Sequence, residues 1–372
     1  MPKTISQQVL LVGGGLAGWS AARRLAGCRG LRVTWLDPRA DPQWLPGLPA
    51  RLGARAHPAA ADREVLARAA RRWGHAHVRD EVIALDEARL TAVGRAAEYR
   101  ADAILLACGC RPASCPFDGF ASLHRLTDAA AAAALRRAFV EEDRRNWVVA
   151  GGGETGVQAA TQLWRCAQEE GLDRKLFVVE RGPALCATMG AAFADYIERQ
   201  VSWLGIEVMR GTRIVGVDGG DVLLEGDRRV KQAGVVWCVG VEGQPFARAL
   251  ETPQTRDGRL SVNAFLQVER QERLFAAGDA AAVFDREGRP LRLSVQAAVR
   301  QGAQAADNLL AQLEGRPLRA YRHRDWGFLL PLGNGRGCGL VLGVPLYGRL
   351  PPVLHRLLLA CAAGFRFREC GR

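Results

Sequence analysis

The chain has 372 residues, of which 48% are hydrophobic and 24% are charged, and this length is enough for two or three folded domains. Its formal net charge of +12 suits a surface that meets anionic lipid or nucleic acid, although the arginines are scattered along the whole chain. No apolar run reaches the ~18–20 residues of a membrane-spanning helix, and no secretory signal opens the sequence, so we expect a cytoplasmic protein.

The stretch from Gln8 to Leu25 predicts a buried strand, a glycine-rich turn and a helix. Its three glycines are Gly13, Gly15 and Gly18. In a dinucleotide-binding unit the first glycine forms a tight turn, the second lets the backbone approach a pyrophosphate, and the third lets helix and strand pack closely. The next apolar strand ends at Asp37, at the spacing expected for an acceptor of ribose hydroxyl groups.

The chain then predicts the rest of a first α/β unit. Residues 38–58 are rich in Pro, Ala and Arg and indicate a loop, and residues 62–73 predict an amphipathic helix. Short strands are expected between 78 and 107. The CGCRP turn at 108–112 follows a buried strand, as where a chain leaves a Rossmann sheet.

A second cycle repeats the pattern of the first. After a helix over 128–140, an apolar strand leads into a second glycine motif, and the strand 175–180 ends in an acid, Glu180. The glycines of this motif are Gly151, Gly153 and Gly156. The repetition makes a dinucleotide-binding function far more specific than one motif would, and two such units suggest a protein that holds FAD and NAD(P)H face to face.

The remaining sequence predicts strands within 207–239, the motif LFAAGD at 274–279 and a long helix over 292–313. A hairpin with its turn at Asn334–Gly337 and an amphipathic segment over 350–367 close the chain.

The motifs GGGLAG, LLACGCRP, GGGETG and LFAAGD, in this order, resemble those of the pyridine nucleotide-disulfide oxidoreductase superfamily. LFAAGDAAAV followed by SVQAAVRQGAQAADNL is similar to the type II NADH:quinone oxidoreductases. The tail DWGFLLPLGNGRGCGLVLGVPLYGRL resembles that of the ferroptosis-suppressor, apoptosis-inducing-factor-like quinone reductases.

The resemblance implies an α/β fold with two Rossmann-like, glutathione-reductase-like domains and a small C-terminal β-hairpin and helix. It implies a discontinuous FAD-binding domain over 1–115 and 255–325, an NAD(P)H-binding domain over 116–254, and a C-terminal segment over 326–372. It also implies FAD as cofactor and NADH or NADPH as cosubstrate, with hydride passing to flavin N5 and two electrons then passing to a quinone.

By this resemblance, several residues are expected to bind the cofactor or the cosubstrate. Those for FAD are Gly13, Gly15, Gly18, Asp37, Arg111, Gly278 and Asp279, and those for NAD(P)H are Gly151, Gly153, Gly156 and Glu180. The carboxylate of Glu180 favours NADH, since it would repel a 2′-phosphate, and the neighbouring Arg181 weakens this preference.

Two departures from the family pattern give the candidate catalytic residues. Gln158 stands where many of the quinone reductases carry a glutamate beside the nicotinamide and the flavin. Gln296, Arg300 and Gln301 stand where they often carry two glutamines four residues apart. The helix that contains them is expected to bring its N-terminus, near Ser294, to the pyrimidine side of the flavin.

Two other functions stay open. A sulfur compound or a protein could be the electron acceptor, with Cys166 and Cys338 as candidate thiols and Cys110 and Cys115 as a candidate disulfide. Alternatively, the chain could be a flavoprotein without enzymatic activity that binds a protein or nucleic acid, of which nucleic acid is not favoured. Otherwise the ten cysteines are expected to be free, and no metal site is predicted.

The segment 350–368 has an apolar helical face flanked by basic residues, which suits an anionic membrane surface, a homodimer contact or packing onto the FAD domain. The apolar positions are Val353, Leu354, Leu357, Leu358, Cys361 and Phe365. We favour the membrane, and thus a peripheral location on its cytoplasmic face.

Overall fold

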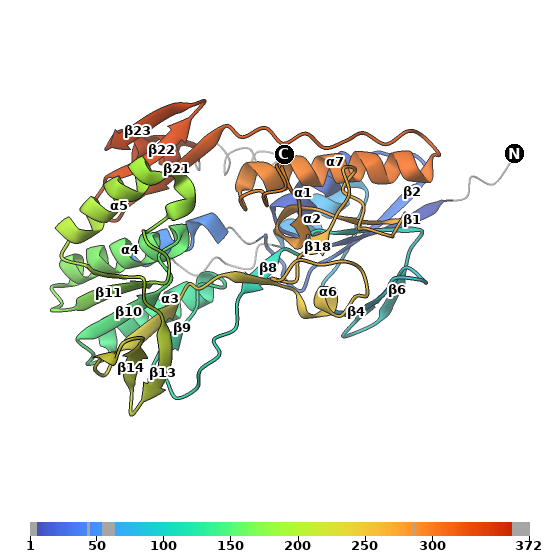
Figure 1. Ribbon diagram of the computed structural model, residues 1–372. Helices are drawn as coiled ribbons and strands as arrows, with labels where there is room; N and C mark the ends of the chain where they lie inside the picture. Colours follow the sequence, from blue (N-terminus) through green and yellow to red (C-terminus); the bar gives the residue numbers. More distant parts are fainter. Residues whose placement is uncertain (1–5, 43–44, 54–63, 286, 359–372) are drawn as a thin grey trace, which may run out of the picture. The chain divides into compact units, whose positions relative to one another are not determined.

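The computed structural model describes residues 6–42, 45–53, 64–285 and 287–358. They divide into two compact units (Figure 1). Unit 1 contains 6–42, 64–111 and 241–325, and unit 2 contains 45–53, 112–240 and 326–358.

Unit 1 is built on a five-stranded parallel sheet in the order β19-β7-β1-β2-β3. Its strands are β1 (Gln7–Val12), β2 (Leu31–Leu36), β3 (Ala76–Val78), β7 (Ala103–Leu106) and β19 (Leu274–Ala276). The helices of this unit are α1 (Leu16–Arg24), α2 (Val65–Trp73), α6 (Pro245–Arg248) and α7 (Val295–Leu313). Its smaller strands are β4 (Val82–Asp86), β5 (Thr91–Gly94), β6 (Glu98–Arg100), β17 (Val241–Gly243), β18 (Leu260–Ser261) and β20 (Ala281–Ala282), with β8 (Cys110–Pro112) at the boundary.

Unit 2 repeats the architecture with a parallel sheet in the order β12-β11-β10-β16-β9. Its strands are β9 (Leu123–His124), β10 (Asn146–Ala150), β11 (Lys175–Glu180), β12 (Glu207–Arg210) and β16 (Gly234–Trp237). Its helices are α3 (Ala129–Glu141), α4 (Glu154–Glu170) and α5 (Ala191–Trp203). A separate antiparallel sheet contains β13 (Ile214–Asp218), β14 (Asp221–Leu224) and β15 (Arg228–Val230).

Local sequence explains where the helices begin and end. Asp128 caps α3 by accepting the N–H of Ala131 at 2.8 Å, and Ser294 caps α7 by accepting that of Ala297 at 3.2 Å. Helix α4 ends at Gly171, whose φ of +66° is the left-handed conformation that glycine adopts without strain.

The boundaries between the two units in the structure differ from the domain boundaries expected from the sequence. The units divide at 111 and 240 rather than at 115 and 254, because β17 pairs with β8 and α6 packs into the core of unit 1. The predicted loop around residue 50 contains two short 3-10 helices, η1 (Leu45–Gly47) and η2 (Pro49–Arg51), and belongs to unit 2.

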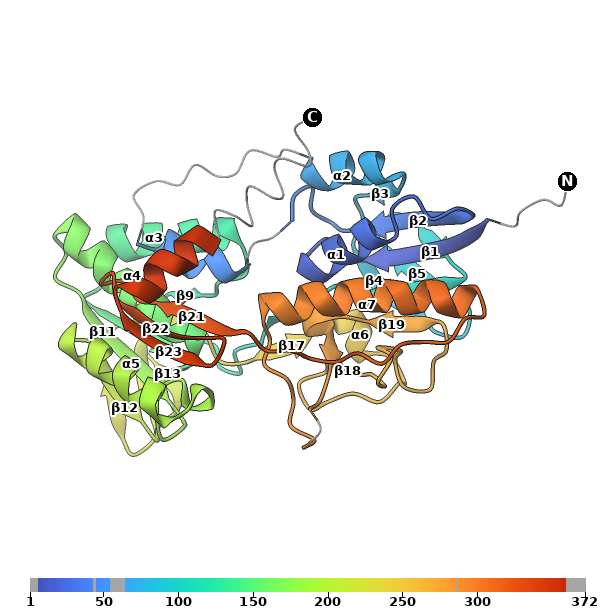
Figure 2. The same ribbon diagram turned by 90° about the horizontal axis from the view of Figure 1, so that it is seen from above.

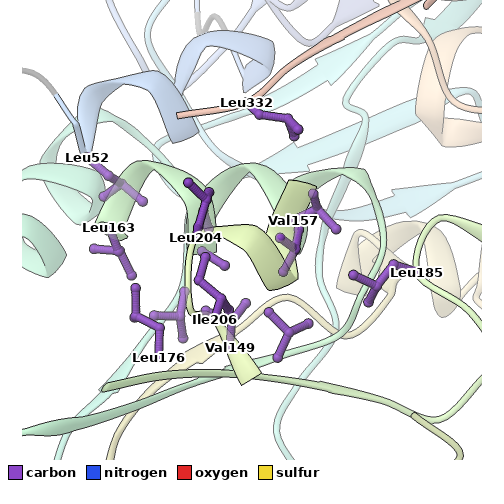
Figure 3. Close-up of a cluster of buried hydrophobic side chains, with 14 of the residues drawn as sticks. Leu52, Val149, Val157, Leu163, Leu176, Leu185, Leu204, Ile206 and Leu332 are labelled. Carbon is purple, nitrogen blue, oxygen red and sulfur yellow. The ribbon is translucent and has the colours of Figure 1, made fainter. Parts of the chain in front are cut away.

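The C-terminal residues form part of unit 2 and contain three strands where a hairpin was expected. The strands are β21 (Gly327–Pro331), β22 (Gly337–Val341) and β23 (Val344–Gly348), and residues 350–358 are helical. Figure 3 shows Leu52 from the 45–53 segment and Leu332 from the turn after β21 packed in one core with Val157 and Leu163 of α4. Burial of these leucines explains why both segments fold onto unit 2.

None of the described helices is long and apolar enough to cross a membrane. The remaining part of the predicted amphipathic segment, which includes Cys361 and Phe365, lies outside the described residues.

Candidate dinucleotide sites

The first glycine motif folds into a tight loop between β1 and α1. Gly13 has φ +111°, and a Cβ atom there would lie 2.3 Å from the carbonyl oxygen of Ala107. A Cβ on Gly18 would lie 1.9 Å from the carbonyl oxygen of Gly13. Both positions therefore require glycine. Gly15 differs, because a Cβ there would meet no atom within 4 Å.

The second glycine motif has the same geometry between β10 and α4. Gly151 has φ +98°, with a virtual Cβ 2.6 Å from the carbonyl oxygen of Cys238, and a Cβ on Gly156 would lie 1.8 Å from that of Gly151. Gly153 again faces open space. The internal repeat is thus a repeat of backbone geometry.

The acids that end the second strands are tied to these loops. The Asp37 carboxylate accepts the N–H of Gly14 at 2.6 Å, and the Glu180 carboxylate accepts that of Gly152 at the same distance. Asp37 also forms an ion pair with Arg39 at 3.0 Å. Each oxygen of Glu180 accepts one N–H group and has a further lone pair, so this acid retains the capacity to accept a ribose hydroxyl group. Each oxygen of Asp37 already accepts two N–H groups, from Gly14 and Arg39, so a ribose hydroxyl group would replace a bond from the Arg39 side chain.

These two loops fit the pyrophosphate of a dinucleotide. Gly15 and Gly153 are the N-cap residues of α1 and α4, so no capping side chain covers the N–H groups of the first helical turn. Open space at the same glycines leaves room for the phosphate oxygens to approach those N–H groups and the positive end of the helix dipole.

A pocket in unit 1 lies beside the N-terminus of α7. We call it the α7 pocket, and its walls come from the LFAAGD motif, from the loop before α7 and from the first turns of that helix. It is lined by Arg259, Gly278, Asp279, Ala281, Val283, Leu291, Arg292, Leu293, Ser294, Ala297, Ala298 and Gln301. The pocket brings together Gly278, Asp279 and Gln301, which sequence analysis assigned to the flavin site.

Burial dominates the electrostatics of this pocket. It raises the pKa of Asp279 above its ordinary value, and the positive charge of Arg259 opposes this rise. The thiol of Cys110 donates to the carbonyl oxygen of Asp279 at 2.9 Å, and burial raises the pKa of this thiol well above its usual range. Cys110 and Cys115 are both free thiols.

The predicted residues of α7 point in two directions. Gln301 is buried, and its Oε1 accepts the N–H of Gly278 at 2.8 Å. Gln296 instead donates to Asp325 at 2.6 Å, and Arg300 donates to the carbonyl oxygens of Arg322 and Arg324, each at 3.2 Å. These two side chains hold the segment that follows α7, and only Gln301 lines the pocket.

The other two predicted residues make contacts within their own units. Gln158 of α4 donates to the carbonyl oxygen of Pro331 in β21 at 3.4 Å. Arg111 of β8 forms an ion pair with Glu242 of β17 at 2.8 Å, and it does not line the α7 pocket.

Sequence reasoning missed a tryptophan that holds the first glycine loop. The indole N–H of Trp35 donates to the carbonyl oxygen of Gly13 at 2.9 Å, and the side chain is fully buried. Trp35 packs against Trp19 and Trp73, with ring centroids 6.0 and 6.2 Å away. In the sequence this residue reads only as one more apolar position of β2.

Two parallel-sheet units, each with a glycine loop and a terminal acid, define the class of proteins that bind two dinucleotides. Residues 7–302 match the family model described as pyridine nucleotide-disulphide oxidoreductase, and the chain belongs to this family. FAD is the cofactor that this membership indicates and a pyridine nucleotide is the second dinucleotide, and the geometry of the two loops is consistent with both.

Relatives with related names share part of the sequence. A demethylphylloquinone reductase from Synechocystis sp. is 32% identical over 213 residues, which cover 56% of this chain and 52% of the relative. A type II NADH:quinone oxidoreductase from Haemophilus influenzae is 26% identical over 219 residues, which cover 55% of this chain and 48% of the relative. The matched part thus spans about half the length of these relatives.

Solved structures share the fold over more of the chain. NDH2 from Plasmodium falciparum, solved with NADH, has a TM-score of 0.82 at 13% identity, covering 98% of this chain and 97% of that one. An NAD-dependent persulfide reductase from A. fulgidus has a TM-score of 0.75 at 19% identity, covering 89% and 63%. At these identities the likeness shows the fold alone.

Proposed function

We propose that this chain is an FAD-dependent NAD(P)H:quinone oxidoreductase. The observation that carries the proposal is the pair of complete glycine loops, each open at its middle glycine and each tied to a terminal acid. The chemistry that a bound flavin supplies is acceptance of a hydride from NAD(P)H at N5, followed by donation of two electrons to an acceptor.

In unit 1, the chain's own residues bind and polarise the cofactor. The N–H groups at the start of α1 bind the pyrophosphate, with Asp37 and Arg39 beside the loop to bind the adenosine ribose. The N-terminus of α7 faces the α7 pocket, so its dipole favours negative charge there.

In unit 2, Glu180 sets the preference for the nicotinamide cosubstrate. Its carboxylate accepts the N–H groups of Gly152 and Gly182, which fix it at the end of β11. A carboxylate held there repels the 2′-phosphate of NADPH, and we therefore propose NADH as the preferred donor, with Arg181 reducing the margin.

A quinone is the acceptor that the relatives favour, because their names include demethylphylloquinone reductase and NADH:quinone oxidoreductase. A sulfur acceptor is the weaker candidate. Cys166 and Cys338 are buried, and burial raises the pKa of Cys338 to about 12, so that little thiolate forms near neutral pH. The third hypothesis, a flavoprotein without enzymatic activity, gives no role to the second glycine loop, whose geometry matches that of the first.

We also propose that the C-terminal helix binds an anionic membrane surface peripherally. In the helical residues 350–358, Leu357 and Leu358 are 57% and 61% exposed, and the net charge of the chain is +12. A homodimer contact through the same side chains is the alternative.

The decisive experiment is rapid anaerobic mixing of the flavin-loaded protein with NADH. We expect the absorption band near ~450 nm, where oxidised flavin absorbs, to bleach, and to recover on addition of a quinone. If the band does not bleach, the proposed oxidoreductase activity is wrong. If it bleaches but no quinone restores it, a quinone is not the electron acceptor. Cys166→Ser and Cys338→Ser should leave turnover unchanged; loss of turnover in either would instead support a sulfur acceptor.

A further inference from the structure

Arg259 is a buried cation in the wall of the α7 pocket, and the proposed function gives it no role so far. It directly precedes β18, which pairs in parallel with β20 at Leu260 and Ala281, so it lies beside the end of the LFAAGD motif. Figures 1 and 2 both show β18 close to α7 in unit 1. The Arg259 side chain lines the pocket together with Asp279 and the first turns of α7.

One edge of the Arg259 guanidinium group is held by the loop that precedes β18. Its Nε donates to the Asp257 carboxylate at 2.8 Å. This carboxylate also accepts the hydroxyl group of Thr255, whose oxygen accepts the backbone N–H of Arg259 at 3.2 Å. These bonds fix the position of the side chain without using its terminal nitrogens.

The terminal nitrogens of Arg259 are available to a ligand. The side chain is only 9% exposed, and among the residues that the structure describes no acceptor bonds to Nη1 or Nη2. Four of the five N–H donors of a guanidinium group belong to these two nitrogens. Burial of a charge with most of its donors unpaired is costly, so we expect a ligand in the pocket that accepts from them.

The charges around the pocket favour a negative acceptor. The lining contains two cations, Arg259 and Arg292, and one carboxylate, Asp279. The N-terminal end of α7 adds the partial positive charge of the helix dipole, and Asp257, outside the lining, offsets part of the total. Burial raises the pKa of Asp279, and the charge of Arg259 opposes this rise, as expected for a cation that acts inside the pocket.

We propose that Arg259 donates through Nη1 and Nη2 to the pyrimidine side of the bound flavin and raises the reduction potential of the flavin. Reduction increases the negative charge on that side, and a hydrogen bond to a charged acceptor is stronger than one to a neutral carbonyl group. Arg259 therefore stabilises reduced flavin more than oxidised flavin. The inference rests on the proposed function in one respect, namely that FAD binds with this side of the flavin in the α7 pocket.

The test is the reduction potential of FAD bound to the full-length protein, measured by anaerobic titration with dithionite in the presence of a redox dye. This measurement needs neither NADH nor a quinone. Arg259→Gln removes the charge, so the ratio of reduced to oxidised flavin at a fixed dye potential should fall about tenfold, the extra strength of a hydrogen bond to a charged acceptor. For a two-electron couple this is a decrease of about 30 mV. Arg259→Lys keeps the charge and should have a potential closer to the native value.

Asp257→Asn is the matched control, because it removes the same ion pair and leaves the cation in the pocket. Its flavin potential should not fall below the native value. If Arg259 only fastens the loop before β18, Arg259→Gln and Asp257→Asn will both lower the melting temperature and leave the potential unchanged, and the inference is wrong.

Two further outcomes separate this inference from its alternatives. If Arg259→Gln binds FAD more weakly at an unchanged potential, the side chain contacts a part of FAD whose charge does not change on reduction, which also overturns the inference. Bleaching by NADH is recorded in the same preparations. A native protein whose bound FAD is not bleached by NADH contradicts the proposed oxidoreductase activity alone, since the dye still reports the potentials of all the variants.

Discussion

At the scale of single residues, Trp35 shows how a core side chain can control a ligand site. Its ring fills the space between β2 and the helices, as any large apolar residue could, while its N–H holds the carbonyl oxygen of Gly13. Gly13 requires a positive φ, so the orientation of its peptide group decides where the first N–H groups of α1 point.

Trp35→Phe should therefore weaken FAD binding more than its loss of volume explains. The Gly13 carbonyl oxygen would lose a buried partner, which costs about 1–3 kcal/mol. We expect a lower melting temperature and a tenfold or greater rise in the FAD dissociation constant, at about 1.4 kcal/mol per factor of ten, measured by titration. Trp73→Phe changes the same aromatic cluster without touching the bond to Gly13, and equal effects from both variants would contradict the prediction.

Cys338 provides a prediction at the same scale, on the acceptor. Burial raises its pKa to about 12, and the negative charge of Glu154 adds to the rise. Alkylation needs the thiolate, so iodoacetamide should leave Cys338 unmodified in the folded protein at pH 8 and modify it after unfolding, as peptide mass spectrometry can show. Rapid modification of the folded protein would reopen the sulfur acceptor.

Sequence reasoning predicted the glycine loops, whose pattern is local, and missed the residues that act through the fold. Gly13 and Gly18 were predictable as glycines because the tight loop leaves no room there for a side chain, and Gly15 is the position that the motif leaves open for a pyrophosphate. The different orientations of the α7 side chains were not predictable. Gln296 and Arg300 contact residues 322–325 after the helix, whereas Gln301 contacts Gly278. Which side of a helix meets a later segment depends on packing that no local pattern encodes.

At the scale of secondary-structure elements, the two strand–loop–helix units allow a matched experiment. Gly15 and Gly153 have φ of −73° and −74° and open space at Cβ, so alanine fits both without strain. Since no described atom lies within 4 Å of the added methyl group, the conflict that we predict is with a bound pyrophosphate. Gly18 and Gly156 conflict with the protein itself, because a Cβ would lie within 2 Å of a carbonyl oxygen.

We expect Gly153→Ala to fold with its FAD bound and to weaken NADH binding at least tenfold, and Gly15→Ala to fold but lose FAD. Calorimetry measures folding, the ratio of flavin to protein absorbance measures FAD content, and titration with NADH measures its affinity. Gly18→Ala and Gly156→Ala should instead reduce the soluble yield. If Gly153→Ala leaves NADH affinity unchanged, the second loop is not the nicotinamide site.

Most elements of the two sheets were predictable, because buried parallel strands are short apolar runs and because α3 and α7 begin at the capping residues Asp128 and Ser294. The C-terminal region was not. Its third strand, β23, has the exposed residues Val344 and Tyr347, and it follows a turn at Leu342 with φ +50°, where glycine would be expected. It pairs with β22 and packs on α5, where the Tyr347 ring contacts Phe193 and Tyr196, so its place depends on tertiary contacts.

At the scale of the whole molecule, charge and exposed apolar surface combine in one prediction. A chain of net charge +12 is attracted to an anionic bilayer, but charge alone gives a weak, salt-sensitive contact. The leucines exposed at 350–358 add apolar burial, at about 25 cal/mol per Å².

The full-length protein should co-sediment with phosphatidylglycerol vesicles more than with phosphatidylcholine vesicles, and added salt should reduce the binding only in part. Leu357→Glu combined with Leu358→Glu should abolish it, since both changes place carboxylates in the apolar contact. Ile83→Glu, at a 48% exposed position on β4 of unit 1, is the control and should bind as the native protein does. If the double variant still sediments while it loses a dimer peak in size-exclusion chromatography, these leucines form a contact between two copies of the chain.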